Sequence, residues 1–160
     1  MKKVFVFLLL MSSLASFGQI KVADKTTESW KTIGSVGAMG SANTILERSG
    51  DLIKLTFRDI RFTQLKVYEE VTFKDVDNAF ENLYSVIMDA LENMPEENIT
   101  LKLPDGDLVL RFEKSFGKVN MNFVYFVSGV QEPAMSEYLT EKKVNKLFGK
   151  STKKKKKKKK

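Results

Sequence analysis

The sequence predicts an α+β protein, in which a curved antiparallel sheet of about 6–7 strands packs on one long amphipathic helix and a short helix follows near the C-terminus. Two observations carry this prediction. Several segments alternate apolar and polar residues with the period of two that is typical of half-buried strands. One segment, residues 76–93, instead repeats apolar residues every three or four positions, as an amphipathic helix does. A lone helix with one apolar face needs a sheet to cover it.

The first half of the chain is expected to supply about four strands. Their expected spans are residues 30–33, 43–48, 52–58 and 65–73. The third alternates most clearly, because Ile53, Leu55 and Phe57 fall on one face and polar residues on the other. The fourth departs from the pattern at one position, since Glu69 falls on the face assigned to the core.

The helix expected over residues 76–93 carries its apolar residues on one stripe. The stripe consists of Val76, Ala79, Phe80, Leu83, Ile87, Ala90, Leu91 and Met94. Asp75 is suited to cap the helix N-terminus, and Pro95 ends the run.

The second half predicts a three-stranded meander and a short helix. The expected strands cover residues 99–103, 108–113 and 119–127, with turns at 104–107 and 116–118. In the last strand Val124 and Phe126 interrupt the polar face, so this part is expected to be covered on both sides. Thr140 is expected to cap the short helix and Gly149 to end it.

The N-terminus has the pattern of a cleavable export signal over residues 1–18. Lysines at positions 2 and 3 precede an apolar run over residues 4–11, and small residues end the segment. Cleavage is expected between Gly18 and Gln19, or alternatively after Ala15. The apolar run is shorter than the roughly 20 residues that a transmembrane helix needs. The expected location is therefore the periplasm, the cell surface or the medium.

The sequence ends in an unbroken lysine run. It consists of Lys153, Lys154, Lys155, Lys156, Lys157, Lys158, Lys159 and Lys160. Adjacent ammonium groups repel one another, so residues 151–160 are expected to form a disordered tail. The signal segment and tail hold ten of the 27 Lys and Arg, which leaves 17 against 20 Asp and Glu. The single domain expected over residues 19–150 is therefore mildly acidic.

The lysine tail suits an anionic surface, because a lysine near such a surface contributes about 1 kcal/mol of attraction. Envelope lipid or polysaccharide is the partner that the tail indicates. Nucleic acid is disfavoured, since the basic charge is not part of the domain. A tail that binds nothing in particular is the remaining alternative. The folded domain is expected to offer a sheet face or pocket to a partner, which the sequence does not identify.

The composition excludes several chemistries. Without any His or Cys, the chain cannot carry Ser–His–Asp or Cys–His catalysis or the usual zinc and copper sites. No cofactor or metal is predicted. The 105–107 turn lacks the further acidic ligands of a calcium loop. Gly34, Gly37 and Gly40 lack the Lys-Ser/Thr of a phosphate-binding loop, so a sheet bend or a close backbone approach is favoured there.

Two sets of residues remain as site candidates. Glu69, Glu70 and Asp75 could supply carboxylate catalysis, with the pKa of Glu69 raised if it is buried. A strand bulge or edge position that lets Glu69 reach solvent is the alternative. The second set could line an apolar ligand pocket, although core packing explains it as well. It consists of Trp30, Phe116, Tyr125 and Phe126, together with Phe123.

The sequence therefore favours an exported, non-enzymatic binding module of the cell envelope, with a basic tail that contacts an anionic surface. A periplasmic carrier of a small apolar ligand is the first alternative, and a carboxylate-based hydrolase is the second.

Overall fold

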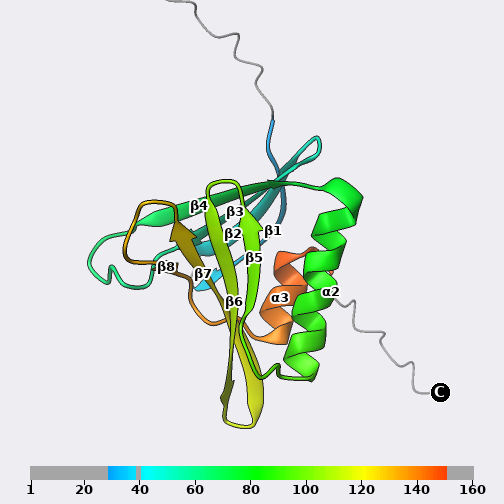
Figure 1. Cartoon of the computed structure of the whole chain (residues 1–160), viewed down its shortest axis with the longest axis vertical. Helices are drawn as coiled ribbons and strands as arrows, with labels where there is room; N and C mark the ends of the chain where they lie inside the picture. Colours follow the sequence, from blue (N-terminus) through cyan, green and yellow to red (C-terminus); the bar gives the residue numbers. More distant parts are fainter. Residues whose placement is uncertain (1–28, 39–40, 151–160) are drawn as a thin grey trace, which may run out of the picture.

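The computed structural model describes residues 29–38 and 41–150. It confirms the α+β class, but the strands of this part of the chain form two four-stranded antiparallel sheets (Figure 1). The expectation of one sheet of about 6–7 strands was therefore wrong. Each sheet joins only strands that follow one another in sequence, and the helical segment between β4 and β5 separates the two sets. The proposed signal segment and lysine tail lie outside the described residues.

The first sheet has the order β1-β2-β3-β4. Its strands are β1 (Lys31–Ala38), β2 (Ser41–Ser49), β3 (Leu52–Arg58) and β4 (Tyr68–Lys74). The bounds and inward face of β3 match the prediction, since Ile53, Leu55 and Phe57 are buried. In β4, Val71 is buried and pairs with Leu55.

The fourth strand begins later than the alternation predicts. Residues 59–67 form a loop instead, in which Leu65 is 64% exposed. The reason is a pair of hydrogen bonds from the start of the loop. The amide of Asp59 donates to the carbonyl of Val67 at 2.9 Å, and the amide of Ile60 donates to the carbonyl of Met135 at 2.9 Å. The first bond joins the two ends of the loop, and the second holds the loop against the second sheet.

The long helix also begins later than predicted. A 3-10 turn, η2 (Val76–Asn78), precedes α2 (Ala79–Glu92), because Asp77 and Asn78 take left-handed φ angles of 53° and 59°. The centre of the predicted stripe is confirmed, since Phe80, Leu83, Ile87 and Ala90 are buried. Its two ends are not in the core: Val76 is 59% exposed and Met94 is 46% exposed.

The second sheet has the order β5-β6-β7-β8. Its strands are β5 (Ile99–Leu103), β6 (Gly106–Ser115), β7 (Lys118–Val127) and the short β8 (Ala134–Met135). Both predicted turns are present as two-residue hairpin connections, because Leu103 pairs with Gly106 and Ser115 pairs with Lys118. The expectation of double cover in β7 is met at Val124, which is buried, and fails at Phe126, which is 42% exposed.

The C-terminal helix α3 (Glu141–Leu147) is confirmed together with its cap, since the Thr140 hydroxyl accepts a hydrogen bond from the Lys143 amide. It packs on β1 and β2. Gly34 makes this contact possible, because a Cβ there would lie 2.3 Å from the carbonyl oxygen of Lys146. The register of β1 also shifts beside Gly34 and Gly37. A close backbone approach at Gly34, favoured by the sequence, is confirmed, whereas Gly40 lies outside the described residues.

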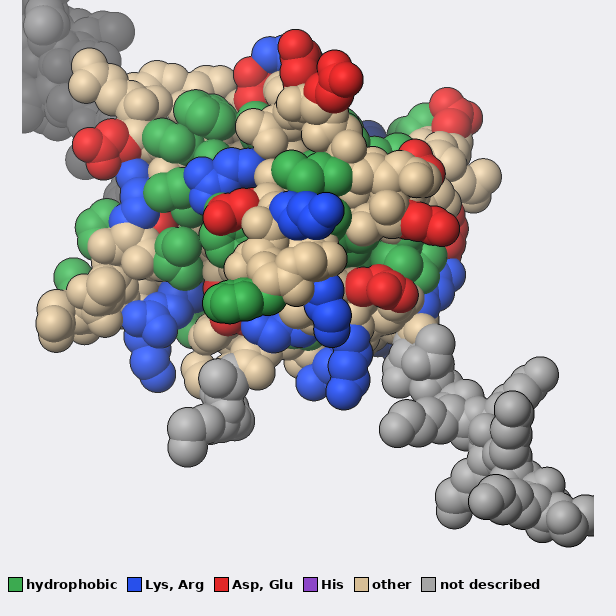
Figure 2. All heavy atoms as spheres, turned by 90° about the horizontal axis from the view of Figure 1, so that it is seen from below, with side chains coloured by type: hydrophobic (Ala, Val, Ile, Leu, Met, Phe, Trp, Pro, Cys, Tyr) green, Lys and Arg blue, Asp and Glu red, His purple; other side chains and the backbone are tan. Residues whose placement is uncertain are grey.

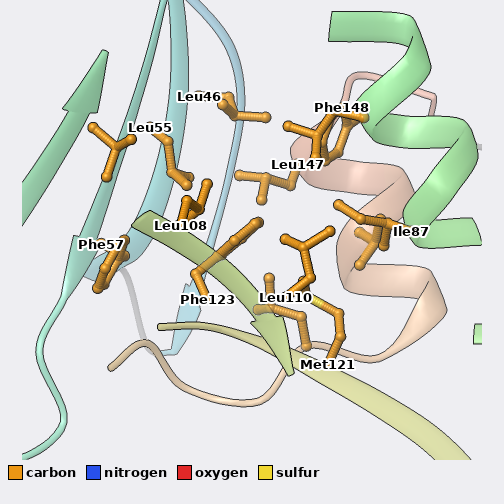
Figure 3. Close-up of a cluster of buried hydrophobic side chains, with 14 of the residues drawn as sticks. Leu46, Leu55, Phe57, Ile87, Leu108, Leu110, Met121, Phe123, Leu147 and Phe148 are labelled. Atoms are coloured by element: carbon orange, nitrogen blue, oxygen red, sulfur yellow. The ribbon is translucent and has the colours of Figure 1, made fainter. Parts of the chain in front are cut away.

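One hydrophobic core joins the two sheets and the two helices (Figure 3). Phe57 from the first sheet and Phe123 from the second stack with ring centroids 6.4 Å apart. Ile87 from α2 and Leu147 from α3 are fully buried in the same cluster. The apolar faces of the two sheets are therefore buried together in one shared core.

Candidate functional site

An apolar hollow lies between α2 and the edge strand β5, and we call it the α2–β5 groove. Its volume is about 450 Å³, and its lining is mostly apolar. It is lined by Phe73 at the end of β4, by Val76, by Ala79, Asn82, Leu83 and Val86 of α2, by Thr100, Leu101, Lys102 and Leu103 of β5, and by Leu108 of β6. In Figure 1, β5 is the strand of its sheet drawn nearest to α2.

The position of α2 along this groove is fixed at its N-terminus by Asp75. One carboxylate oxygen accepts the amide of Phe80 at 2.9 Å, and the other pairs with the guanidinium of Arg48 at 2.7 Å. The bond from the Phe80 amide, helped by Arg48 and opposed by burial, holds the pKa of Asp75 below its ordinary value. The left-handed turn that follows leaves Val76 exposed at the rim of the groove.

The groove runs along the outer backbone edge of β5. Four consecutive residues of the strand line it, although their side chains alternate between the two faces of the sheet, so the groove must border the strand edge itself. Among the described residues, no hydrogen bond reaches this edge from outside the β5–β6 pairing. Unpaired strand edges of this kind are templates for pairing with another chain.

The structure does not bring the three candidate carboxylates together. Glu69 and Glu70 are neighbours in β4 and point to opposite faces, with Glu70 exposed. Asp75 lies beyond the other end of this strand, about 20 Å from Glu69 at the rise of an extended chain. Its carboxylate is already occupied by Arg48 and the Phe80 amide. The arrangement offers no pair of carboxylates for acid–base work.

Glu69 does lie within electrostatic reach of another predicted residue, Tyr125. Burial raises the pKa of the Tyr125 hydroxyl, and the charges of Asp105 and Glu69 add to the increase. The ring of Tyr125 crosses the backbone of β6 at Gly106, where a Cβ would lie 3.2 Å from it. Because its raised pKa keeps the hydroxyl protonated, Tyr125 can donate a hydrogen bond, but it is a poor proton acceptor.

The predicted aromatic pocket is not formed, because its members lie apart. Phe123 and Tyr125 are buried in the core, whereas Phe126 faces outward. Phe116 is fully exposed in the β6–β7 turn. Trp30 lies beside the first sheet, where the Lys54 ammonium sits 4.5 Å from its ring centroid.

A polar network on the outer face of the second sheet was not predicted. The Arg111 guanidinium donates to Asn122 at 3.0 Å and to the Tyr138 hydroxyl at 2.8 Å, and that hydroxyl donates to Glu113. Asn122 is fully buried and donates to the carbonyl of Ser136 at 3.2 Å. The network fastens residues 136–138 to the sheet, and its groups satisfy one another.

The described residues contain no group of three or more acidic, His or Cys side chains that could hold a metal ion. The 105–107 turn is a hairpin, in which Asp107 pairs with Lys102 at 2.6 Å. Within residues 29–38 and 41–150, no helix is both long enough and apolar enough to cross a membrane. The eight candidate lysines, 153–160, are outside the described part of the chain.

The groove itself was missed by sequence reasoning, although one signal pointed to it. Val86 lies beside the predicted helix stripe and is 40% exposed, so it widens the apolar surface of α2 beyond what the core covers.

Comparison with known protein families, with curated proteins and with solved structures finds no match to this chain.

Proposed function

We propose that the chain is a non-enzymatic binding module that takes an extended, apolar peptide segment of a partner into the α2–β5 groove. The observation that carries the proposal is the combination of an apolar lining with the unpaired backbone edge of β5. Recognition of extended peptides uses both features, because strand pairing supplies affinity and side-chain pockets supply specificity.

The geometry defines what the peptide must offer. A strand added beside β5 directs alternate side chains to one side, so every second residue would meet the groove. Val76 and Val86 present exposed apolar surface there. Apolar residues at alternate positions of the peptide therefore fit the groove, with polar residues between them facing solvent.

A carrier of a small apolar ligand is the second candidate, because the volume of about 450 Å³ lies within the range of small-molecule sites. The peptide is favoured, since the groove runs along unpaired backbone that an apolar ligand would leave without hydrogen bonds. The separation of Glu69, Glu70 and Asp75 gives no support to a carboxylate-based hydrolase.

We infer that the module acts at the cell envelope. The export signal pattern of residues 1–18 supports a place in the cell envelope, outside the cytoplasm. The lysine run over residues 153–160 supports attachment to anionic lipid or polysaccharide there. The tail would concentrate the module at the surface, and the groove would select the partner.

The test is a selection of peptides from a random library against the full chain, followed by binding to two matched variants. Val86→Lys places a charge in the groove, and Ser85→Lys places the same charge one residue away, on an exposed site of the same helix that does not line the groove. Selected peptides should bind Ser85→Lys as they bind the original chain and should bind Val86→Lys at least tenfold more weakly.

Amide resonances of Ile99–Leu103 should shift when such a peptide is added. Equal binding to both variants, or shifts confined to other strands, would place the site elsewhere. If the library yields no binders and an apolar fluorescent probe is taken up stoichiometrically in a Val86-dependent manner, the carrier function replaces the peptide-binding function.

A further inference from the structure

The β6–β7 hairpin ends in an apolar residue that no described residue covers. Phe116 is fully exposed and lies at the turn between β6 and β7. In Figure 1 this hairpin extends below the rest of the molecule, beyond the ends of both helices. We call residues 114–118 the hairpin tip.

The backbone at the hairpin tip is unfavourable for the residue that occupies it. Phe116 has a φ of 48°, and Gly117 has a φ of 75°. Two consecutive positive φ angles define the type I′ turn, which strongly prefers Asn-Gly. A phenylalanine in this position adds strain and exposes a large apolar ring. Local strain that folding does not require is a pointer to function.

The hairpin tip is also basic. It contains Lys114 and Lys118 and no acidic residue, and neither lysine has a carboxylate within ion-pair distance in the described part of the chain. Acidic groups border the tip on one side: Glu113 accepts the Tyr138 hydroxyl, and Glu92 and Glu141 line a hollow together with Lys114 and Lys118. Figure 2, which views this end, shows hydrophobic side chains set among Lys and Arg, with Asp and Glu interspersed.

From these observations we propose that the hairpin tip enters the headgroup region of an anionic lipid bilayer. Phe116 would bury its ring at the boundary with the acyl chains, and Lys114 and Lys118 would contact lipid phosphates. Aromatic rings beside lysines are typical of segments that lie in this interface. The domain itself is mildly acidic, so the lysine run over residues 153–160 is the part of the chain that favours approach to such a surface. The inference adds a lipid contact in the folded body to the tail anchor proposed above, and it does not depend on the groove.

The experiment measures which part of the full chain enters the bilayer. Phe116→Trp and a matched variant, Leu65→Trp, are each made in a Trp30→Phe background, so that each has one tryptophan at an exposed site. Leu65 is 64% exposed in the β3–β4 loop and serves as the control. The probes are vesicles of phosphatidylcholine and phosphatidylglycerol with brominated acyl chains, which quench a tryptophan that reaches them.

The expected result is quenching and a blue shift of emission in Phe116→Trp, with little change in Leu65→Trp. Phe116→Asn in the otherwise unchanged chain should bind anionic vesicles about tenfold more weakly in high salt, where screening weakens the lysine tail. Vesicles of phosphatidylcholine alone should bind both chains weakly.

Three outcomes would overturn the lipid contact of the hairpin tip, and each has a different consequence for the proposed tail anchor. Binding without quenching at either position would leave the tail as the only lipid contact. Quenching in Leu65→Trp alone would move the contact to the β3–β4 loop. Absence of vesicle binding would overturn the tail anchor as well. Peptide binding in the groove is measured separately and is unaffected by all three.

Discussion

The carboxylate of Asp59 is fully buried and pairs with the guanidinium of Arg61, with Oδ2 and an Nη atom 2.6 Å apart. The same carboxylate accepts the backbone amides of Arg61 at 3.1 Å and of Met135 at 3.3 Å. One side chain therefore fixes the start of the β3–β4 loop and ties it to β8 in the other sheet. In Figure 1 the β3–β4 loop lies beside β8.

Removing the charge of Asp59 should destabilise the protein. Asp59→Asn keeps the side-chain shape but leaves Arg61 without its anionic partner, and we expect the free energy of unfolding to fall by about 2 kcal/mol. The measurement is urea denaturation. Glu132→Gln is the matched control, since Glu132 also pairs with Arg61 but is 85% exposed, and its loss should cost less than about 0.5 kcal/mol. Equal effects of the two variants would contradict this account of Asp59.

The free energy of unfolding should decrease at acidic pH, because Asp59 and Asp75 become protonated. Burial disfavours the charged form of Asp59, but hydrogen bonds from Arg61 and Met135 outweigh it and hold the pKa of this group below its ordinary 3.8. The pKa of Asp75 is also lowered. A carboxyl group with a lowered pKa stabilises the fold above its unfolded pKa, and this contribution is lost as pH falls through the folded pKa.

We therefore expect the urea concentration at the midpoint of unfolding to decrease when the pH is lowered below about 4. The double variant Asp59→Asn, Asp75→Asn should be less stable at neutral pH and should lose less of its stability on acidification. An unchanged acid dependence in the double variant would assign the effect to other carboxyl groups.

Relief of strain at the hairpin tip should stabilise the protein. Phe116→Asn creates the Asn-Gly pair that a type I′ turn prefers, and the free energy of unfolding should rise by about 0.5–1 kcal/mol. Thermal denaturation measures the change. A decrease would show that Phe116 makes contacts that support the fold.

Adding a methyl group at Gly34 should disrupt the contact between β1 and α3. In Gly34→Ala the new Cβ would collide with the carbonyl oxygens of Lys146 and Leu147, which are both backbone atoms and cannot swing away. The expected loss in unfolding free energy is about 1–3 kcal/mol. Gly50→Asn is the control, because Gly50 has a φ of 58°, which Asn tolerates, and no neighbouring atoms within 4 Å of a Cβ. A loss of the same size in both variants would argue against a specific collision.

The elements that were predicted well are those whose signal is local. β3 shows its period of two in seven consecutive residues, and α3 shows its cap at Thr140. The start of β4 was misjudged because residues 65–67 alternate as a strand would, while the bond from Asp59 to Val67 closes a loop around them.

The division into two sheets and the groove could not be predicted for a related reason. Both depend on whether β4 pairs with β5, and no sequence feature of either strand identifies the strand that it pairs with across the intervening helix.

The predicted aromatic pocket was wrong because side chains alternate between the two faces of β7: Tyr125 enters the core, and Phe126 faces outward. The exposure of Phe116 could not be predicted, because sequence reasoning places large apolar residues in the interior.

The contact between Gly34 and α3 also bears on how the chain acquires its structure during synthesis. β1 is the first described strand and α3 the last helix, and Ile33 of β1 lies against Gly149, just after α3. A chain that emerges N-terminus first cannot close this contact until residues 141–149 have been synthesised. The described fold is therefore completed only after both of its sheets and α2 have already been made.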